Sequence, residues 1–188
     1  MTEIRVQLPS GVTMEQAQEM LGPHGFTVQY ADSRPATWRH IERVGQYMDA
    51  FIIEFMRRRR VHDQSKLASP EVSAFDEATP RLAGLTFASP EYEVERKRLG
   101  EALTHHYANN SHHPDYYPNG IRGMNLLDIM EIFCDSKAAS ERHHDGNIRQ
   151  SIIKMQEKHG FGDELKQILI NTFPIFDKVD PPMAAMAP

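Results

Sequence analysis

Adjacent histidines and aspartates are the residues of this chain best suited to chemistry. Ten of its 188 residues are histidine. The adjacent pairs that matter here are His62-Asp63, His105-His106 and His112-His113. Imidazole nitrogens and carboxylate oxygens bind divalent metal ions and also transfer protons. Metal binding and acid-base catalysis are therefore the first hypotheses.

A further histidine and an acidic helix face extend this set. At about 100° per residue, His40 falls within about 60° of the centre of an apolar stripe, so we expect it to point inward. Asp128, Glu131 and Asp135 follow at i, i+3 and i+7 and share one helix face. By itself such a face is typical of solvated charge. Beside inward histidines it offers oxygen ligands.

Helices are expected to position these side chains. Residues 35–60 form a predicted helix behind Pro35, with apolar residues at steps of three or four. Its stripe consists of Trp38, Ile41, Val44, Met48, Ile52 and Phe55. We expect this stripe to face the core, and the next helix to carry His62 and Asp63.

Capping residues predict where the later helices start. Residues 69–71 and 89–91 both read Ser-Pro-Glu, which places a capping serine before a proline at the first helical position. The second of these helices should run to about Tyr107. Asn125 and Asp128 form a capping pair. The remaining helices are expected over residues 126–143, 147–159 and 163–173.

Residues 108–120 are rich in Asn, Pro and Gly and should form an ordered loop. Of the two preceding histidines, His106 lies closer to the apolar stripe than His105 does. His112 and His113 either belong to a polar surface turn or face the site. Tyr116 and Tyr117 could line a pocket or cover this loop, and His143 and His144 are assigned to a solvated helix end.

The N-terminal residues follow a different pattern. Residues 4–8 and 26–31 alternate apolar and polar like strands, and Thr13 can cap a short helix between them. We therefore predict a mainly α protein: a small β-α-β appendage over residues 1–32, an all-helical bundle over 33–176 and a flexible tail over 177–188.

Composition excludes several classes of protein. With 40% hydrophobic and 25% charged residues the chain resembles an average globular protein. The net charge of −5 gives no strong nucleic-acid signal, and residues 57–60, four arginines, are interpreted as a solvated helix end. No run is apolar enough for a membrane span. With its single cysteine, Cys134, the chain is expected in the cytoplasm.

The order histidine, His-Asp, histidines, aspartate resembles the HD-domain superfamily of metal-dependent phosphohydrolases, over roughly residues 35–145. This resemblance implies an all-helical bundle that binds one divalent ion through His40, His62, Asp63 and a distal aspartate. The segment MEIFCDSKAA favours Asp135 as that aspartate. Asp128 remains the alternative, although its capping position already explains it.

Some members of that superfamily bind a second metal through additional histidines. The segment HDQSK resembles their pattern and implies that Lys66 contacts a substrate phosphate. His106, His112 and His113 would then bind a second ion or the substrate, and the sequence leaves both open. The whole chain also resembles a family of short bacterial and phage proteins of unknown function, which share HHYANNSHHPDYYPNGI and LLDIMEIFCDSKAASERH.

Three functions follow from these resemblances. The first is hydrolysis of a nucleotide-like phosphoester by metal-activated water, with Lys66, His106, His112 and His113 as catalytic residues. The second is a di-iron oxygenase, and the third a non-catalytic, metal-stabilised binding protein. The cofactor would be one or two divalent ions among Mn, Co, Ni, Mg, Zn and Fe. The expected partner is a small phosphoester, and a homodimer is left open.

Overall fold

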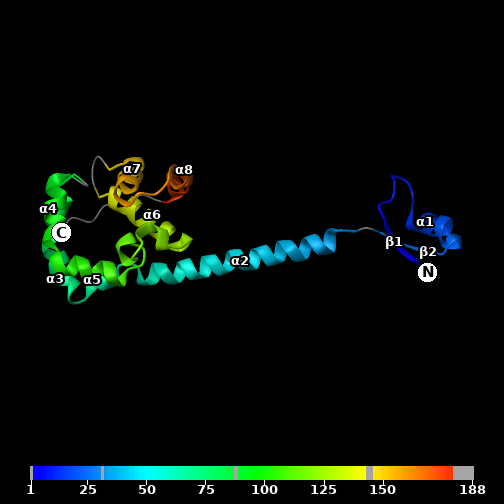
Figure 1. Cartoon of the computed structure of the whole chain (residues 1–188), viewed down its shortest axis with the longest axis horizontal. Helices are drawn as coiled ribbons and strands as arrows, with labels where there is room; N and C mark the ends of the chain where they lie inside the picture. The colour runs from blue at the N-terminus through cyan, green and yellow to red at the C-terminus, as the bar shows by residue number, and fades with distance from the viewer. Residues whose placement is uncertain (1, 31, 87–88, 143–145, 180–188) are drawn as a thin grey trace. The chain divides into compact units, whose positions relative to one another are not determined.

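The computed structural model of the chain describes residues 2–30, 32–86, 89–142 and 146–179. Within these ranges the protein is mainly helical, with eight α-helices and one two-stranded sheet (Figure 1). The predicted fold class, mainly α with a small N-terminal β-α-β element, is confirmed. The chain divides into two compact units, Met1–Glu54 and Phe55–Pro188, and the boundary between them falls inside a helix.

The first unit opens with the predicted β-α-β element. Strands β1 (Thr2–Val6) and β2 (Phe26–Tyr30) pair in parallel, and helix α1 (Met14–Leu21) makes the crossover that parallel pairing requires. Thr13 caps α1 through reciprocal hydrogen bonds with Gln16, as its position predicts.

Helix α2 (Arg34–Val61) is a single element of 28 residues that continues past the unit boundary. None of its described residues is buried, and the predicted stripe, from Trp38 to Ile52, is exposed. The expectation that this stripe faces the core is therefore wrong. The reason is that no other described element of the first unit packs along α2.

The second unit contains the short 3-10 helix η2 (Gln64–Leu67) and six α-helices. These are α3 (Glu71–Ala83), α4 (Pro90–Arg98), α5 (Gly100–Asn109), α6 (Leu126–Ser140), α7 (Ile148–His159) and α8 (Asp163–Thr172). Ser89 caps α4 as predicted, whereas α3 begins without a side-chain cap from Ser69. The helix expected over 89–107 is two helices, because Gly100 has a left-handed φ of 50°.

The apolar core of the second unit lies where α6, α7 and α8 pack side by side (Figure 1). Its buried members are Ile132, Phe133, Ile148, Ile152, Met155, Phe161 and Leu169. The Asn125–Asp128 capping pair and the left-handed Gly160 bound α6 and α7 as predicted. The loop expected over 108–120 is held by two short 3-10 helices, η3 (Pro114–Tyr116) and η4 (Gly120–Gly123).

Two sequence-based expectations fall outside the described residues. His143 and His144 are among the residues that the structure does not describe, as is the predicted tail from residue 180 onward. Over the part of the chain that is described, no helix combines the length and the apolar character that a bilayer span requires.

Candidate metal centre

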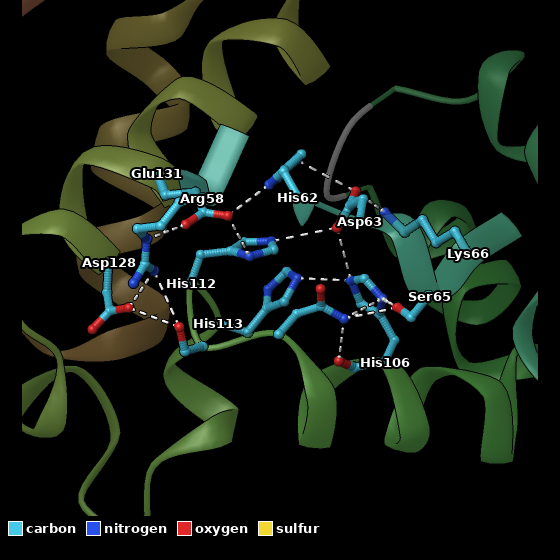
Figure 2. Close-up of polar contacts among 12 residues, drawn as sticks. Arg58, His62, Asp63, Ser65, Lys66, His106, His112, His113, Asp128 and Glu131 are labelled. Atoms are coloured by element: carbon cyan, nitrogen blue, oxygen red, sulfur yellow. Dashed lines mark hydrogen bonds and ion pairs between the residues drawn. The ribbon is translucent and has the colours of Figure 1, made fainter. Parts of the chain in front are cut away.

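Most of the histidines and acids selected from the sequence converge inside the second unit (Figure 2). The last turn of α2 and the residues after it supply Arg58, His62 and Asp63. Helix α5 and the loop that follows it supply His106, His112 and His113. Helix α6 supplies Asp128, Glu131 and Asp135. Segments that are distant in sequence therefore meet at one polar cluster.

Asp63 occupies the turn that ends α2. It is the one described non-glycine residue with a positive φ, 56°, and it directly precedes η2. Aspartate tolerates this left-handed conformation better than bulky residues do. The turn aims one carboxylate oxygen, Oδ1, at the histidines of α5 and its following loop, at 3.4 Å from Nε2 of His106 and 3.5 Å from Nε2 of His112.

Four side chains can offer one atom each to a common ion: Asp63, His106, His112 and His113. The two Nε2 atoms of His106 and His113 are 2.9 Å apart. Ligands with bonds of ~2.1 Å are separated by about 3.0 Å at adjacent octahedral positions and by about 3.4 Å at tetrahedral ones. The observed separations of 2.9, 3.4 and 3.5 Å lie close to these two values.

Two of these four atoms lack hydrogen-bond partners. Oδ1 of Asp63 and Nε2 of His112 are buried, and neither has a hydrogen-bond partner among the residues that the structure describes. A buried polar atom without a partner costs about 1–3 kcal/mol, so native proteins rarely leave one unexplained. A shared cation would satisfy both atoms at once, since they lie only 3.5 Å apart.

Glu71 fixes the orientation of His106. This glutamate, the first residue of α3, is 0% exposed, and its Oε2 atom lies 2.9 Å from Nδ1 of His106. Its other oxygen lies 2.7 Å from Nδ1 of His105. A carboxylate at Nδ1 holds the proton there and leaves the Nε2 lone pair for a metal. Such a carboxylate is the usual outer partner of a metal-binding histidine.

Glu131 plays the same role for His112. Its Oε1 atom lies 3.2 Å from Nδ1 of His112 and 2.9 Å from Nδ1 of His62. Burial alone would raise the pKa of Glu131, but hydrogen bonds from His112, His62 and Arg58 outweigh it and hold the pKa well below its usual range. Glu131 is therefore an ionised acceptor that orients two imidazoles.

Arg58 joins the two acids of α6. Its Nε donates to Glu131 at 2.6 Å, and its Nη2 donates to Asp128 and, at 3.1 Å, to Ser111. Desolvation would lower the pKa of Arg58, yet the two carboxylates raise it. The guanidinium therefore stays charged and keeps Glu131 in place behind His112.

The Asp128 carboxylate is fully engaged in structural hydrogen bonds. Besides Arg58, it accepts from the backbone N–H of Asn125 at 2.9 Å, from Ser111 Oγ at 2.9 Å and from the Tyr117 hydroxyl at 2.7 Å. Burial opposes ionisation, but these donors together lower its pKa. Asp128 thus caps α6 and anchors the histidine loop.

Two histidines of the cluster favour the neutral form, which is the form that binds metal ions. Desolvation is the main cause that lowers the pKa of both His106 and His113. His62 differs, because its hydrogen bond with Glu131 raises its pKa. The pKa is therefore lowered at His106 and His113 and raised at His62, which lies at the edge of the cluster.

His62, Lys66 and Asp135 lie at the solvent-facing edge of the cluster. With Asp63, His62 and Asp135 form a second group of closely spaced ligand atoms. Lys66 Nζ lies 2.6 Å from Oδ2 of Asp63, and its charge helps to lower the pKa of that carboxyl against the opposing effect of burial. The side chains of His62 and Lys66 are both 30% exposed, so this edge is open to solute.

The structure places His40 within the first unit, where its side chain is exposed, and His40 belongs to none of the ligand groups among the described residues. The prediction assumed that His40 and His62 sit on successive helices. Instead α2 runs unbroken from Arg34 to Val61, so His40 lies within this helix and His62 directly follows its last residue.

Two residues of the site, Glu71 and Arg58, were not recognised from the sequence. Glu71 was interpreted only as an acid at a helix start, and Arg58 only as part of a solvated helix end. Glu131 was identified with Asp128 and Asp135 as a possible source of oxygen ligands, because the three share one helix face. In the structure Glu71 and Glu131 are buried, and the Arg58 side chain is only 16% exposed.

The charge of the cluster favours a cation. Two cationic side chains, Arg58 and Lys66, stand against five carboxylates. These carboxylates are Asp63, Glu71, Asp128, Glu131 and Asp135. A donor set of three imidazole nitrogens and one carboxylate oxygen suits zinc, iron, manganese, cobalt or nickel better than magnesium, which prefers oxygen ligands. The residues present therefore fit a transition-metal ion.

Fold and site together define a mainly helical protein with a partly buried cluster of histidines and carboxylates whose spacing could hold a metal ion. Residues 29–175 match a family of unknown function (DUF5662). Because this match covers most of the chain, the protein belongs to that family. No curated protein and no solved structure matches the chain.

Proposed function

We propose that this protein is a divalent-metal-dependent phosphohydrolase that acts on a nucleotide-like phosphoester. Asp63, His106, His112 and His113 would hold the ion. The observation that carries this proposal is the pair of buried ligand atoms without partners, Oδ1 of Asp63 and Nε2 of His112. The carboxylates behind His106 and His112 support it, because both leave Nε2 as the free nitrogen.

The resemblance to the HD-domain superfamily supports the reaction class through His62, Asp63 and Lys66. The ligand set proposed here differs from the one that the resemblance implies. His40 is dropped, and the three histidines assigned to catalysis from sequence take its place around Asp63. His62 and Asp135 become residues of the open edge, where a substrate can approach.

An ion at this centre would lower the pKa of a bound water toward neutrality and polarise a phosphoryl oxygen. The residues of the open edge would balance charge on the substrate and supply a proton. Lys66 would balance negative charge on the phosphoryl group, since its Nζ already lies beside Oδ2 of Asp63. His62, whose pKa is raised by Glu131, would hold the proton that the leaving oxygen needs.

The test is release of phosphate or nucleoside from a panel of nucleotides, with manganese, cobalt, nickel or zinc added to metal-free protein. His112→Gln should abolish turnover, and His40→Gln, an exposed histidine outside the cluster, should keep it. Equal activity of the two variants, or no turnover of any nucleotide with any metal, would count against the proposal. Tight binding of one metal without turnover would leave the third expectation, a metal-stabilised binding protein.

A di-iron oxygenase is the second candidate. The observation that favours it is the adjacency of a further ligand group, His62, Asp63 and Asp135, to the four-residue cluster. A centre of two irons would need both groups. Protein purified without added metal would then contain two irons per chain and absorb visible light, whereas one zinc or manganese per chain would exclude this candidate.

A further inference from the structure

The exposed apolar stripe of α2 in the first unit suggests a partner. We propose that this stripe packs against the same stripe of a second copy of the chain, with the two helices antiparallel. Its seam consists of Ile41, Val44, Met48 and Phe51, all more than 40% exposed. Within the first unit no other described element packs along this face.

The spacing of the seam fits a helix pair. The four residues follow one another at steps of three, four and three, which is the apolar repeat of a two-stranded coiled coil. The sequence of steps reads the same in both directions about position 46. An antiparallel copy therefore places Ile41 opposite Phe51, and Val44 opposite Met48, so that one stripe complements itself.

The exposed apolar area is large enough for a stable pair. The side chains of the seam and its edges, each between 42% and 66% exposed, are Trp38, Ile41, Val44, Tyr47, Met48, Phe51 and Ile52. At roughly 100 Å² each they offer about 700 Å² per copy, close to the ~800 Å² per partner of a typical specific interface. A helix without packed neighbours is only marginally stable in water, so burial of this face would also stabilise α2.

Charge favours a second copy in antiparallel orientation. Residues 38–45 carry Arg39 and Arg43 against Glu42, a net charge of +1, and residues 46–54 carry Asp49 and Glu54, a net charge of −2. Over this stretch, an antiparallel pair brings residues 38–45 of one copy to residues 46–54 of the other, whereas a parallel pair aligns like with like. The four arginines at residues 57–60 lie beyond the seam, near the end of α2. The stretch that contains the seam has a net charge of −1 and does not suit a nucleic acid.

The first experiment measures the mass of the full-length chain by sedimentation over a range of concentrations. We expect a dimer that Met48→Glu converts to a monomer. Ile53→Glu is the matched control, because Ile53 is 52% exposed on the opposite side of α2, and this variant should stay dimeric. Emission from Trp38, the only tryptophan, should shift to the red when the dimer dissociates. Circular dichroism checks that both variants remain folded.

A second experiment tests the orientation in a Cys134→Ser background. Ile41→Cys and Phe51→Cys proteins should form a disulfide-linked dimer when mixed and little when oxidised alone. Cross-linking of each variant with itself alone would overturn the antiparallel arrangement. A monomeric wild-type chain at all concentrations, or a dimer that Met48→Glu leaves intact, would overturn the proposal as a whole. These readouts are independent of the metal centre.

Discussion

Two aspartates at opposite ends of the same polar network differ in how completely their oxygens are used. The Asp128 carboxylate receives hydrogen bonds from a backbone N–H, a serine, a tyrosine and Arg58. Asp63 pairs with Lys66 through one oxygen, and its other oxygen has no hydrogen-bond partner among the described residues. The completed network at Asp128 holds the fold together, whereas the incomplete one at Asp63 is the observation on which the proposed metal site rests.

Removal of metal should have the largest effect on the Asp63 end. A ligand at 1,000 times its Kd stabilises a protein by about 4 kcal/mol, which corresponds to roughly 8–16 °C in Tm for a chain of this size. We therefore expect a chelator to lower Tm by about 10 °C, and zinc or manganese to restore it. Differential scanning calorimetry before and after chelation measures this. An unchanged Tm would mean that the Asp63 end binds no ion.

The Asp128 end should respond to mutation instead. Asp128→Asn removes one of the two carboxylates that pair with Arg58, and loss of one partner of a buried ion pair typically costs about 3–5 kcal/mol, although Glu131 still pairs with Arg58. We expect the lower end, about 3 kcal/mol, in urea unfolding of the metal-free protein. Asp76→Asn, on an exposed position of α3, is the control and should change stability by less than about 0.5 kcal/mol. Equal effects of the two variants would remove the contrast between the two ends.

The smallest expected effect concerns the carboxylate behind His106. Glu71→Gln keeps the shape of the side chain but weakens its hold on the Nδ1 proton, and loss of such an outer partner costs about 10- to 100-fold in metal affinity. Glu77→Gln, on the exposed face of the same helix, should leave affinity unchanged. Competition with a fluorescent chelator measures both. An unaltered affinity of Glu71→Gln would place His106 outside the centre.

Local features of the fold were predictable from the sequence, because they depend on neighbouring residues. Each helix cap is an example: Thr13, Ser89 and the Asn125–Asp128 pair bond to partners within three positions along the chain. The strands of the β-α-β element were predictable from the alternation of apolar and polar residues. The break before Gly100 was missed, since a glycine inside a helical pattern reveals its left-handed φ only in the structure.

The candidate site was predictable only in part. The burial of His106 followed from helical spacing, whereas the exposure of His40 did not, because an apolar stripe does not tell whether anything in the same unit covers it. Glu71 and Arg58 were missed for a different reason. Their partners lie 35 and 70 or more residues away, and pairing over such distances has no local signal in a single sequence.

The metal content of Asp63→Asn compared with that of Asp128→Asn tests the central claim most directly. Elemental analysis of the wild-type chain, purified without chelator, should find at least one equivalent of a transition metal per chain. Asp63→Asn should lose affinity by more than the roughly 100-fold that an outer partner costs, and its content should fall close to zero. Asp128→Asn should keep its metal. A wild-type chain without metal, or an Asp63→Asn protein that retains the full equivalent, would contradict this account.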